Sequence, residues 1–280
     1  MSDDSMLYAV ADGVATLTFN RPDKLNALTP AMLGRFFELV DKAAADDAVR
    51  VIVITGSGRG FCAGLDLAVI GSGVGGQGVG TPPEPAPPPP RQWGDDIGPA
   101  MARFYAGGWN GLITSRKPTI AAINGPVFGW GFILSLHCDI RFAARSALFN
   151  ATFARLGIPG EKNAAWLLSR LLGTARASDL LYSARRFDGA EAERLGVVNA
   201  VFDDDALMPH VAAYAANIVA NSAPRSLAAI KAQIWTAADD SYDAGFIASD
   251  LEQDLATKTQ DFREGITSLR DKRAPNFRGN

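Results

Sequence analysis

Two glycine-rich turns are the part of this sequence best suited to chemistry. Residues 55–66 and residues 117–131 each combine an apolar run with glycines that follow it. In both segments a helical pattern comes after the glycines. Glycine adopts backbone conformations that other residues resist, and the first N–H groups of a helix have no acceptor within that helix. The two turns could therefore point backbone N–H donors into one pocket and stabilise a developing oxyanion.

Glycine after a strand is also typical of nucleotide sites. The first turn carries Gly56, Gly58, Gly60 and Gly64, but it lacks the Gly-Lys-Ser/Thr of a P-loop. The dinucleotide pattern Gly-x-Gly-x-x-Gly is not matched either. A tight turn without function stays the simplest alternative for the first segment taken alone.

Three motifs resemble the crotonase, or enoyl-CoA hydratase/isomerase, superfamily, and the likeness runs from about residue 6 to residue 277. They are residues 20–28 (NRPDKLNAL), residues 61–67 (FCAGLDL) and residues 138–143 (CDIRFA), in the family's order and at its approximate separations. The resemblance implies an α/β protein with a crotonase-type ββα spiral core over residues 1–202. A Gly/Pro-rich flexible insertion is expected at 70–97, and a C-terminal helical trimerisation region at 203–280.

The same resemblance assigns roles in binding an acyl-CoA thioester. The backbone N–H groups of Leu65 and Trp130 would hold the thioester oxygen. The indole of Trp130, where glycine is commonest in the family, would either shape the acyl pocket or simply fill the core. Coenzyme A, as part of the substrate and not as a separate cofactor, would lie along turns that contain Lys24, Leu25, Ala27, Ala63, Gly64, Asp66, Leu67 and Gly129.

The proton-transfer group departs from the hydratase pattern. The family's two hydratase glutamates correspond to Ile133 and Phe153, neither of which can act as acid or base. Glu161 instead occupies the position at which the 3,2-enoyl-CoA isomerase branch and its ring-epoxide isomerase relatives place their one catalytic carboxylate. This resemblance implies that Glu161 is the catalytic carboxylate. A 1,3-proton shift needs only one such base. The alternative for Glu161 is a carboxylate that stabilises the N-terminus of the following helix.

Other polar residues are expected to be structural. Asp66 suits a helix cap, Asp139 a hydrogen-bonded structural acid, and His137 a core histidine on an apolar helix. His210 lies far from every motif. The basic tail at 270–273 and Phe277 could either bind a phosphate of coenzyme A or form a solvated end.

Composition limits the remaining functions. A formal net charge of −3 from 27 basic and 30 acidic residues leaves no basic surface for nucleic acid or an anionic membrane. Two cysteines without metal-ligand spacing argue against a disulfide framework and a metal site, and they favour the cytoplasm. We expect neither a signal peptide nor a membrane span.

Local signals predict the order of elements. Strands are expected at 7–12 and 14–20 around Asp12-Gly13, then a helix from Thr29-Pro30 to about 46 with Met32, Leu33, Phe36, Phe37 and Val40 as its apolar face. Further strands are expected at 49–55, 119–124, 139–144 and 197–202. Helices are expected near 98–115, 129–137, 164–172, 175–182, 189–195, 206–220, 224–237, 243–258 and 261–272.

Three functions follow from these observations. The first is an enoyl-CoA isomerase that works through an oxyanion hole and one carboxylate. The second is an enoyl-CoA hydratase that adds water to a trans-2-enoyl thioester. The third is a non-catalytic acyl-CoA binding subunit, because the loss of both family glutamates is also what an inactive relative would show. For each we expect a homotrimer or hexamer.

Overall fold

The computed structural model describes residues 4–71 and 107–280. Its first two strands, β1 (Met6–Ala11) and β2 (Val14–Phe19), form the predicted antiparallel hairpin. Asp12 and Gly13 between them have φ values of 47° and 77°. Two consecutive positive φ values give a turn whose twist matches that of the strands, which is why an Asp-Gly pair predicts a hairpin.

Helix α1 (Pro30–Ala45) starts and packs as predicted. The Thr29 hydroxyl accepts a hydrogen bond from the Met32 N–H at 3.2 Å, and Pro30 occupies the first helical position. Phe37 is only partly buried, whereas Leu39 and Ala43, which were not expected on the apolar face, are fully buried. The core-facing stripe is therefore wider than the sequence pattern indicated.

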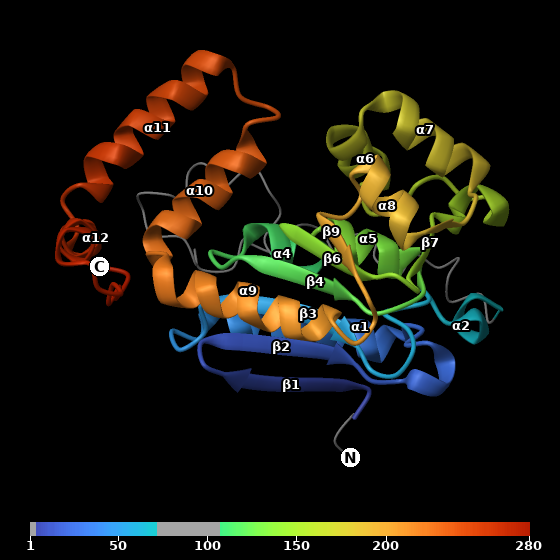
Figure 1. Ribbon diagram of the computed structural model, residues 1–280. Coiled ribbons are helices and arrows are strands. Elements are labelled where there is room, and N and C mark those ends of the chain that lie inside the picture. The colour runs from blue at the N-terminus through green and yellow to red at the C-terminus, as the bar shows by residue number, and fades with distance from the viewer. Residues whose placement is uncertain (1–3, 72–106) are drawn as a thin grey trace.

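A six-stranded sheet forms the centre of the molecule, in the order β1-β2-β3-β4-β6-β9 (Figure 1). Beyond the first hairpin, all its neighbouring strands are parallel. The remaining strands are β3 (Val51–Gly56), β4 (Thr119–Ile123), β6 (Ile140–Ala144) and β9 (Ala200–Phe202). The last strand is shorter than predicted, because residues 197–199 lead into it without joining the sheet.

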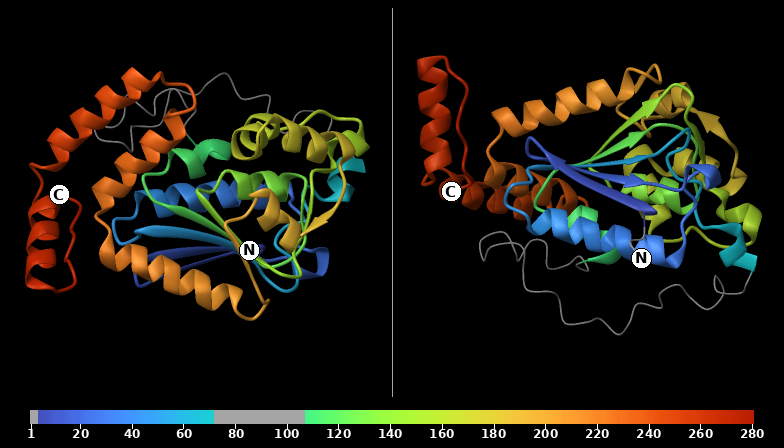
Figure 2. Two further views of the ribbon diagram at one scale, coloured as in Figure 1. Left: turned by 45° about the horizontal axis from the view of Figure 1, so that its top comes forward. Right: turned by 90° about the horizontal axis from the view of Figure 1, so that it is seen from below.

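Helices cover both faces of this sheet. In β3, Val51 and Val53 pack with helix α9 (Leu207–Asn221), whereas Ile52 and Ile54 belong to the larger core that includes α1. Figure 2 shows α1 and α9 on opposite sides of the strands. Burial on both faces explains the continuous apolar run of this strand. Because α9 packs on the sheet, the segment after residue 203 also contributes to the core.

A second, three-stranded sheet was not predicted. It consists of β5 (Val127–Phe128), β7 (Leu148–Asn150) and β8 (Phe187–Asp188), with β7 in the middle. These strands are two or three residues long, too short to show a periodic pattern. Together with the main sheet and its helices, they complete the coiled strand-strand-helix arrangement implied by the resemblance.

Short helices join the strands around the glycine turns. They are η1 (Pro22–Lys24), α2 (Leu67–Gly71), η2 (Gly108–Asn110), α4 (Gly111–Thr114), α5 (Trp130–Leu136) and η3 (Thr152–Leu156). Of the helix predicted near 98–115, only the end falls within the described residues, as η2 and α4. Apart from residues 70 and 71 at the end of α2, the predicted insertion at 70–97 lies outside them.

The predicted helices of the second half are present within one or two residues at each end. Helices α6 (Ala164–Leu172), α7 (Thr174–Ser183) and α8 (Gly189–Leu195) gather at one end of the molecule, and α10 (Pro224–Thr236), α11 (Tyr242–Ala256) and α12 (Gln260–Asp271) extend away at the other (Figures 1 and 2). In the described part of the chain, no helix is both long and apolar enough to cross a bilayer.

Candidate active site

The first glycine turn is fixed by backbone pairing with the segment after η1. The Leu28 N–H donates to the Gly64 carbonyl at 2.7 Å, and the Asp66 N–H donates to the Leu28 carbonyl at 2.9 Å. In such a parallel bridge the residue between the two bonds points its own N–H the other way. The N–H of Leu65 therefore faces away from Leu28, and it has no acceptor within the described residues.

The turn expected to hold coenzyme A is joined to this segment. Leu25 and Asn26 have φ values of 48° and 58°, and the Leu25 carbonyl accepts from the Ala63 N–H at 2.9 Å. The buried Asn26 amide donates to the carbonyls of Ser57 and Gly60 at 3.0 and 2.7 Å. Lys24 is exposed at the end of η1, and Leu67 is exposed at the start of α2. The structure thus joins the turn that contains Leu25 to the first glycine turn at Ala63.

The second glycine turn packs against the first. The Phe128 N–H donates to the Cys62 carbonyl at 3.0 Å, and Val127 forms a parallel bridge with Cys62. A Cβ on Gly131 would lie 2.3 Å from that same carbonyl oxygen. Only glycine allows so close an approach, so Gly131 sets how near α5 comes to the first turn.

The two candidate donors converge at Gly64. This residue has a φ of 89°, and a Cβ on it would lie 2.9 Å from the Phe128 carbonyl oxygen and 3.5 Å from the Trp130 amide nitrogen. Gly129, with a φ of 49°, turns the chain so that Trp130 begins α5. The Trp130 N–H has no acceptor within the described residues. Two unpaired N–H groups from different turns therefore lie close together.

Glu161 contacts the side chain of Trp130. Its carboxylate accepts a hydrogen bond from the indole Nε1 of Trp130 at 2.7 Å. Helix α6 begins at Ala164, and its cap residue Asn163 makes no side-chain cap. Among the described residues, the carboxylate has a hydrogen bond from the Trp130 indole and none from a helix N–H group. Its place three residues before α6 leaves stabilisation by the helix dipole open as the alternative.

Aromatic rings and one lysine surround the indole. Trp109 meets Trp130 edge to face with ring centroids 5.2 Å apart. The Lys162 ammonium lies 5.3 Å from the Trp130 ring centroid and 5.6 Å from that of Trp109, within the range of a cation–π contact. No sequence signal pointed to Trp109, because its partners are distant in the chain.

The two positions of the hydratase glutamates are apolar in the structure as well. Ile133 is 0% exposed and Phe153 is 2% exposed, and both belong to the main hydrophobic core. Neither contributes an acid or base to the site. Glu161, by contrast, hydrogen-bonds the side chain of Trp130, the residue that carries one of the candidate N–H donors.

Asp66 follows Leu65 directly but is used as a cap. Its carboxylate accepts from the Ala68 N–H at 3.0 Å at the start of α2, and from the Arg21 guanidinium at 3.0 Å. The backbone hydrogen bond from Ala68, and next the bond from Arg21, hold the pKa of Asp66 below its usual value. The structural role expected for this residue is confirmed.

The other polar candidates are structural too. His137 is buried, its Nδ1 lies 2.8 Å from the Ile133 carbonyl oxygen, and burial lowers its pKa to about 4. It is therefore neutral near pH 7. His210 stacks on Phe202 with ring centroids 4.0 Å apart. Asp139 accepts hydrogen bonds from the backbone N–H and hydroxyl of Thr119 and from the Trp235 indole. Within the described residues, no three His, Cys, Asp or Glu side chains cluster to hold a metal ion.

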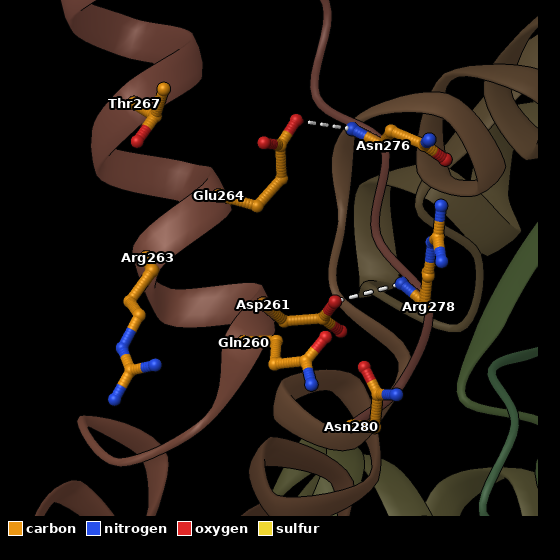
Figure 3. A pocket seen from close by; sticks show the side chains of 8 residues that line it. All are labelled: Gln260, Asp261, Arg263, Glu264, Thr267, Asn276, Arg278 and Asn280. Atoms are coloured by element: carbon orange, nitrogen blue, oxygen red, sulfur yellow. Dashed lines mark hydrogen bonds between the residues drawn. The ribbon is translucent and has the colours of Figure 1, made fainter.

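The C-terminal tail folds back on α12, and most of its residues, including 271–274, remain exposed. Asp261 accepts from the backbone N–H groups of Arg278 and Gly279 at 2.7 and 2.8 Å, and Glu264 accepts from Asn276 at 2.7 Å. A hollow of about 320 Å³ lies between helix and tail (Figure 3). Figures 1 and 2 place α12 at the opposite end of the molecule from α6, which begins three residues after Glu161.

Comparison with known proteins identifies the family of this chain. The model of a family described as enoyl-CoA hydratase/isomerase matches residues 9–79 and 101–280. The chain belongs to the enoyl-CoA hydratase/isomerase family. Among members of this family, the 1,2-epoxyphenylacetyl-CoA isomerase of Escherichia coli is 36% identical over 277 residues, which cover 98% of each chain. A probable enoyl-CoA hydratase of Mycobacterium tuberculosis is 35% identical over 201 residues, covering 72% of this chain and 71% of that protein.

Solved structures of the enoyl-CoA hydratase/isomerase family have the same fold. A probable enoyl-CoA hydratase/isomerase from Mycobacterium abscessus aligns with a TM-score of 0.83 at 27% identity, over 98% of this chain and 99% of that one. An enoyl-CoA hydratase from Bacillus anthracis also aligns with a TM-score of 0.83, at 26% identity, over 99% of this chain and 100% of that one. The expected crotonase spiral with a C-terminal helical region is confirmed.

Proposed function

We propose that this protein is an enoyl-CoA isomerase that moves a carbon–carbon double bond with Glu161 as its one acid/base. The observation that carries the proposal is the hydrogen bond between the Glu161 carboxylate and Trp130, the residue whose backbone N–H starts α5 next to Gly64. This contact links the carboxylate to the residue that supplies one of the two candidate N–H donors.

The reaction needs no second ionisable group. Glu161 would remove a proton from the α-carbon of a 3-enoyl thioester, and the electrons of that C–H bond would form a double bond to the carbonyl carbon as the carbonyl electrons move to oxygen. When the carbonyl re-forms, the α,β double bond appears and the electrons of the β,γ bond take up a proton at the γ-carbon. The N–H groups of Leu65 and Trp130 would stabilise the negative charge on the thioester oxygen of the dienolate. Glu161 would then return the proton to the γ-carbon, which restores the carboxylate and gives the 2-enoyl thioester.

A hydratase is the second candidate, favoured by the names of several relatives, among them the probable hydratase of Mycobacterium tuberculosis. Hydration requires water to be activated and the α-carbon to be protonated, commonly with two carboxylates. The apolar Ile133 and Phe153 supply neither. The isomerase of Escherichia coli, with 36% identity over nearly the whole chain, supports the single-carboxylate proposal.

Two further features belong to the proposal. The acyl-CoA thioester would approach along the edge formed by residues 24–27 and 63–67. The protein would assemble as a trimer or hexamer through its C-terminal helices, whose exposed apolar side chains include Tyr242, Phe246, Ile247, Leu251, Ile266 and Leu269. The buried free thiols of Cys62 and Cys138 support the expectation of a cytoplasmic protein.

The test is to incubate the protein in deuterated water with a trans-3-enoyl-CoA and, separately, with a trans-2-enoyl-CoA, and to identify the products by mass spectrometry. The isomerase predicts a 2-enoyl product from the first substrate, without a 3-hydroxyacyl thioester. A 3-hydroxyacyl product from the second substrate would instead show a hydratase. Tight acyl-CoA binding without turnover of either substrate would show the non-catalytic subunit.

A further inference from the structure

Trp130 contributes two different N–H groups to the site. Its backbone N–H is one of the two candidate oxyanion donors, and its indole N–H donates to Glu161 at 2.7 Å. The side chain is 6% exposed, and it is fixed by the edge of Trp109 and by the Lys162 ammonium on its face. The indole is therefore a buried, well-packed donor with little freedom to move away from the carboxylate.

Glu161, by contrast, is held in place by little else. Its carboxylate receives no second hydrogen bond from the described residues, and the next two residues, Lys162 and Asn163, have φ values of 50° and 63°. Consecutive left-handed residues without glycine are uncommon and are typical of functional turns. This backbone turns sharply beside the carboxylate, so the indole is the side-chain contact that determines where Glu161 points.

We propose that the indole of Trp130 is the positioning group for Glu161. It engages one carboxylate oxygen and leaves the other to remove and return the proton. An indole N–H can donate but not accept, so Trp130 cannot be a second acid/base, and it stabilises the ionised carboxylate that must act first. The inference rests on the proposed function, because it concerns the same carboxylate.

The sharpest variant replaces Trp130 with benzothienylalanine, in which sulfur takes the place of the indole N–H and the ring size is kept. The backbone N–H stays in place, so the oxyanion contact is preserved. Loss of a hydrogen bond to a charged group should lower kcat by about 10- to 100-fold. KM should change by less than about twofold, since the indole then acts on the base and not on substrate binding. The acid limb of the kcat/KM profile should move to higher pH, because the ionised carboxylate loses a stabilising donor.

Trp235 offers a matched control. Its indole Nε1 donates to the Asp139 carboxylate at 2.8 Å, a contact of the same chemistry away from the oxyanion turns. The same replacement at Trp235 should lower the Tm while leaving the pH profile in place. An unmoved profile and unchanged kcat in the Trp130 variant would overturn the inference. A raised KM at unchanged kcat would also overturn it, by assigning the indole to the acyl group.

A measurement on the unmodified protein covers the case in which the variant fails to fold. The chain has five tryptophans, so indole labelling with nitrogen-15 gives five N–H resonances, and that of Trp130 is assigned through Trp130→Phe. Its chemical shift should follow pH with the midpoint of the acid limb, whereas a shift independent of pH would overturn the inference. Activity that survives in Glu161→Gln would instead overturn the proposed function. Because this variant keeps Trp130, the two failures can be told apart.

Discussion

Two indole–carboxylate pairs in this protein have the same hydrogen bond but different surroundings. Trp130 donates to Glu161 at 2.7 Å, and Trp235 donates to Asp139 at 2.8 Å. Asp139 also accepts from the Thr119 N–H at 2.8 Å and from the Thr119 hydroxyl at 2.9 Å, and it pairs with the Lys231 ammonium at 2.8 Å.

The two carboxylates differ in how many of their oxygens already have hydrogen-bond partners. Asp139 is surrounded by donors and a buried cation, so both of its carboxylate oxygens already have partners within the fold. Glu161 has one donor among the described residues, and one of its oxygens stays available. A carboxylate that is fully satisfied stabilises the fold, whereas one that is held at a single oxygen can exchange a proton. The type of residue and its neighbour alone would not have separated the two.

The largest effect is expected from Glu161→Gln. The amide keeps the shape of the side chain but cannot take the proton, so kcat for isomerisation should fall by about 1,000-fold. Steady-state kinetics with a trans-3-enoyl-CoA measures the loss, and calorimetric titration with a saturated acyl-CoA should give an unchanged Kd. If the variant retained most of its activity, Glu161 would be no more catalytic than Asp139, and the comparison would fail.

Asp139→Asn should act on stability and not on rate. The change leaves Lys231, whose side chain is 4% exposed, buried without its anionic partner. Removing one partner of a buried pair should lower the free energy of unfolding by about 3 kcal/mol. Urea denaturation measures this change, and kcat of the folded variant should stay within a few-fold of the unmodified protein. A large drop in kcat without a loss of stability would make Asp139 part of the site.

Gly64→Ala tests the geometry that joins Glu161 to the oxyanion donors. The new Cβ would lie 2.9 Å from the Phe128 carbonyl oxygen at a φ of 89°, so the turn must shift and carry the Leu65 N–H with it. Displacing one oxyanion donor should lower kcat by about 100-fold. Gly34→Ala is the matched control, because no atom lies within 4 Å of a Cβ at that helical position. The control should be slightly more stable, by up to about 1 kcal/mol, and fully active.

Asp66→Ala gives the smallest effect and concerns a third carboxylate, one residue from an oxyanion donor. Loss of the cap on α2 should lower the free energy of unfolding by about 1 kcal/mol at pH 7. The pKa of Asp66 is lowered in the folded protein, first by the Ala68 N–H, so its contribution is present above the unfolded value of about 3.9 and is lost as pH falls through the lower folded value. Denaturation curves of the two proteins should therefore converge in acid. A gap that stayed constant with pH would show that the cap acts through packing alone.

Much of the fold could be predicted because its signals are local. The Asp12-Gly13 turn, the Thr29 cap and the apolar run of β3 each need only neighbouring residues to be recognised. The second sheet could not be predicted, since β5 and β8 are two residues long and pair only through distant β7. The burial of Leu39 and Ala43 also depends on what packs against α1 from elsewhere in the chain.

The site divides in the same way. Glycine spacing predicted the two turns, and the resemblance to the 3,2-enoyl-CoA isomerase branch singled out Glu161 as the carboxylate. The indole contact joins residues 31 positions apart through a turn with two left-handed residues, Lys162 and Asn163, that are not glycine. No propensity points to such a turn, so neither the role of Trp130 toward Glu161 nor the place of Trp109 could be predicted.

The most direct test of a single carboxylate is to follow the proton itself. A trans-3-enoyl-CoA with deuterium at the α-carbon should be converted in ordinary water under single-turnover conditions, and the label located by NMR. We predict that part of the deuterium appears at the γ-carbon of the 2-enoyl product, carried there by Glu161, and that Glu161→Gln gives no product. Formation of the same labelled product by Glu161→Gln at the rate of the unmodified protein would contradict the account.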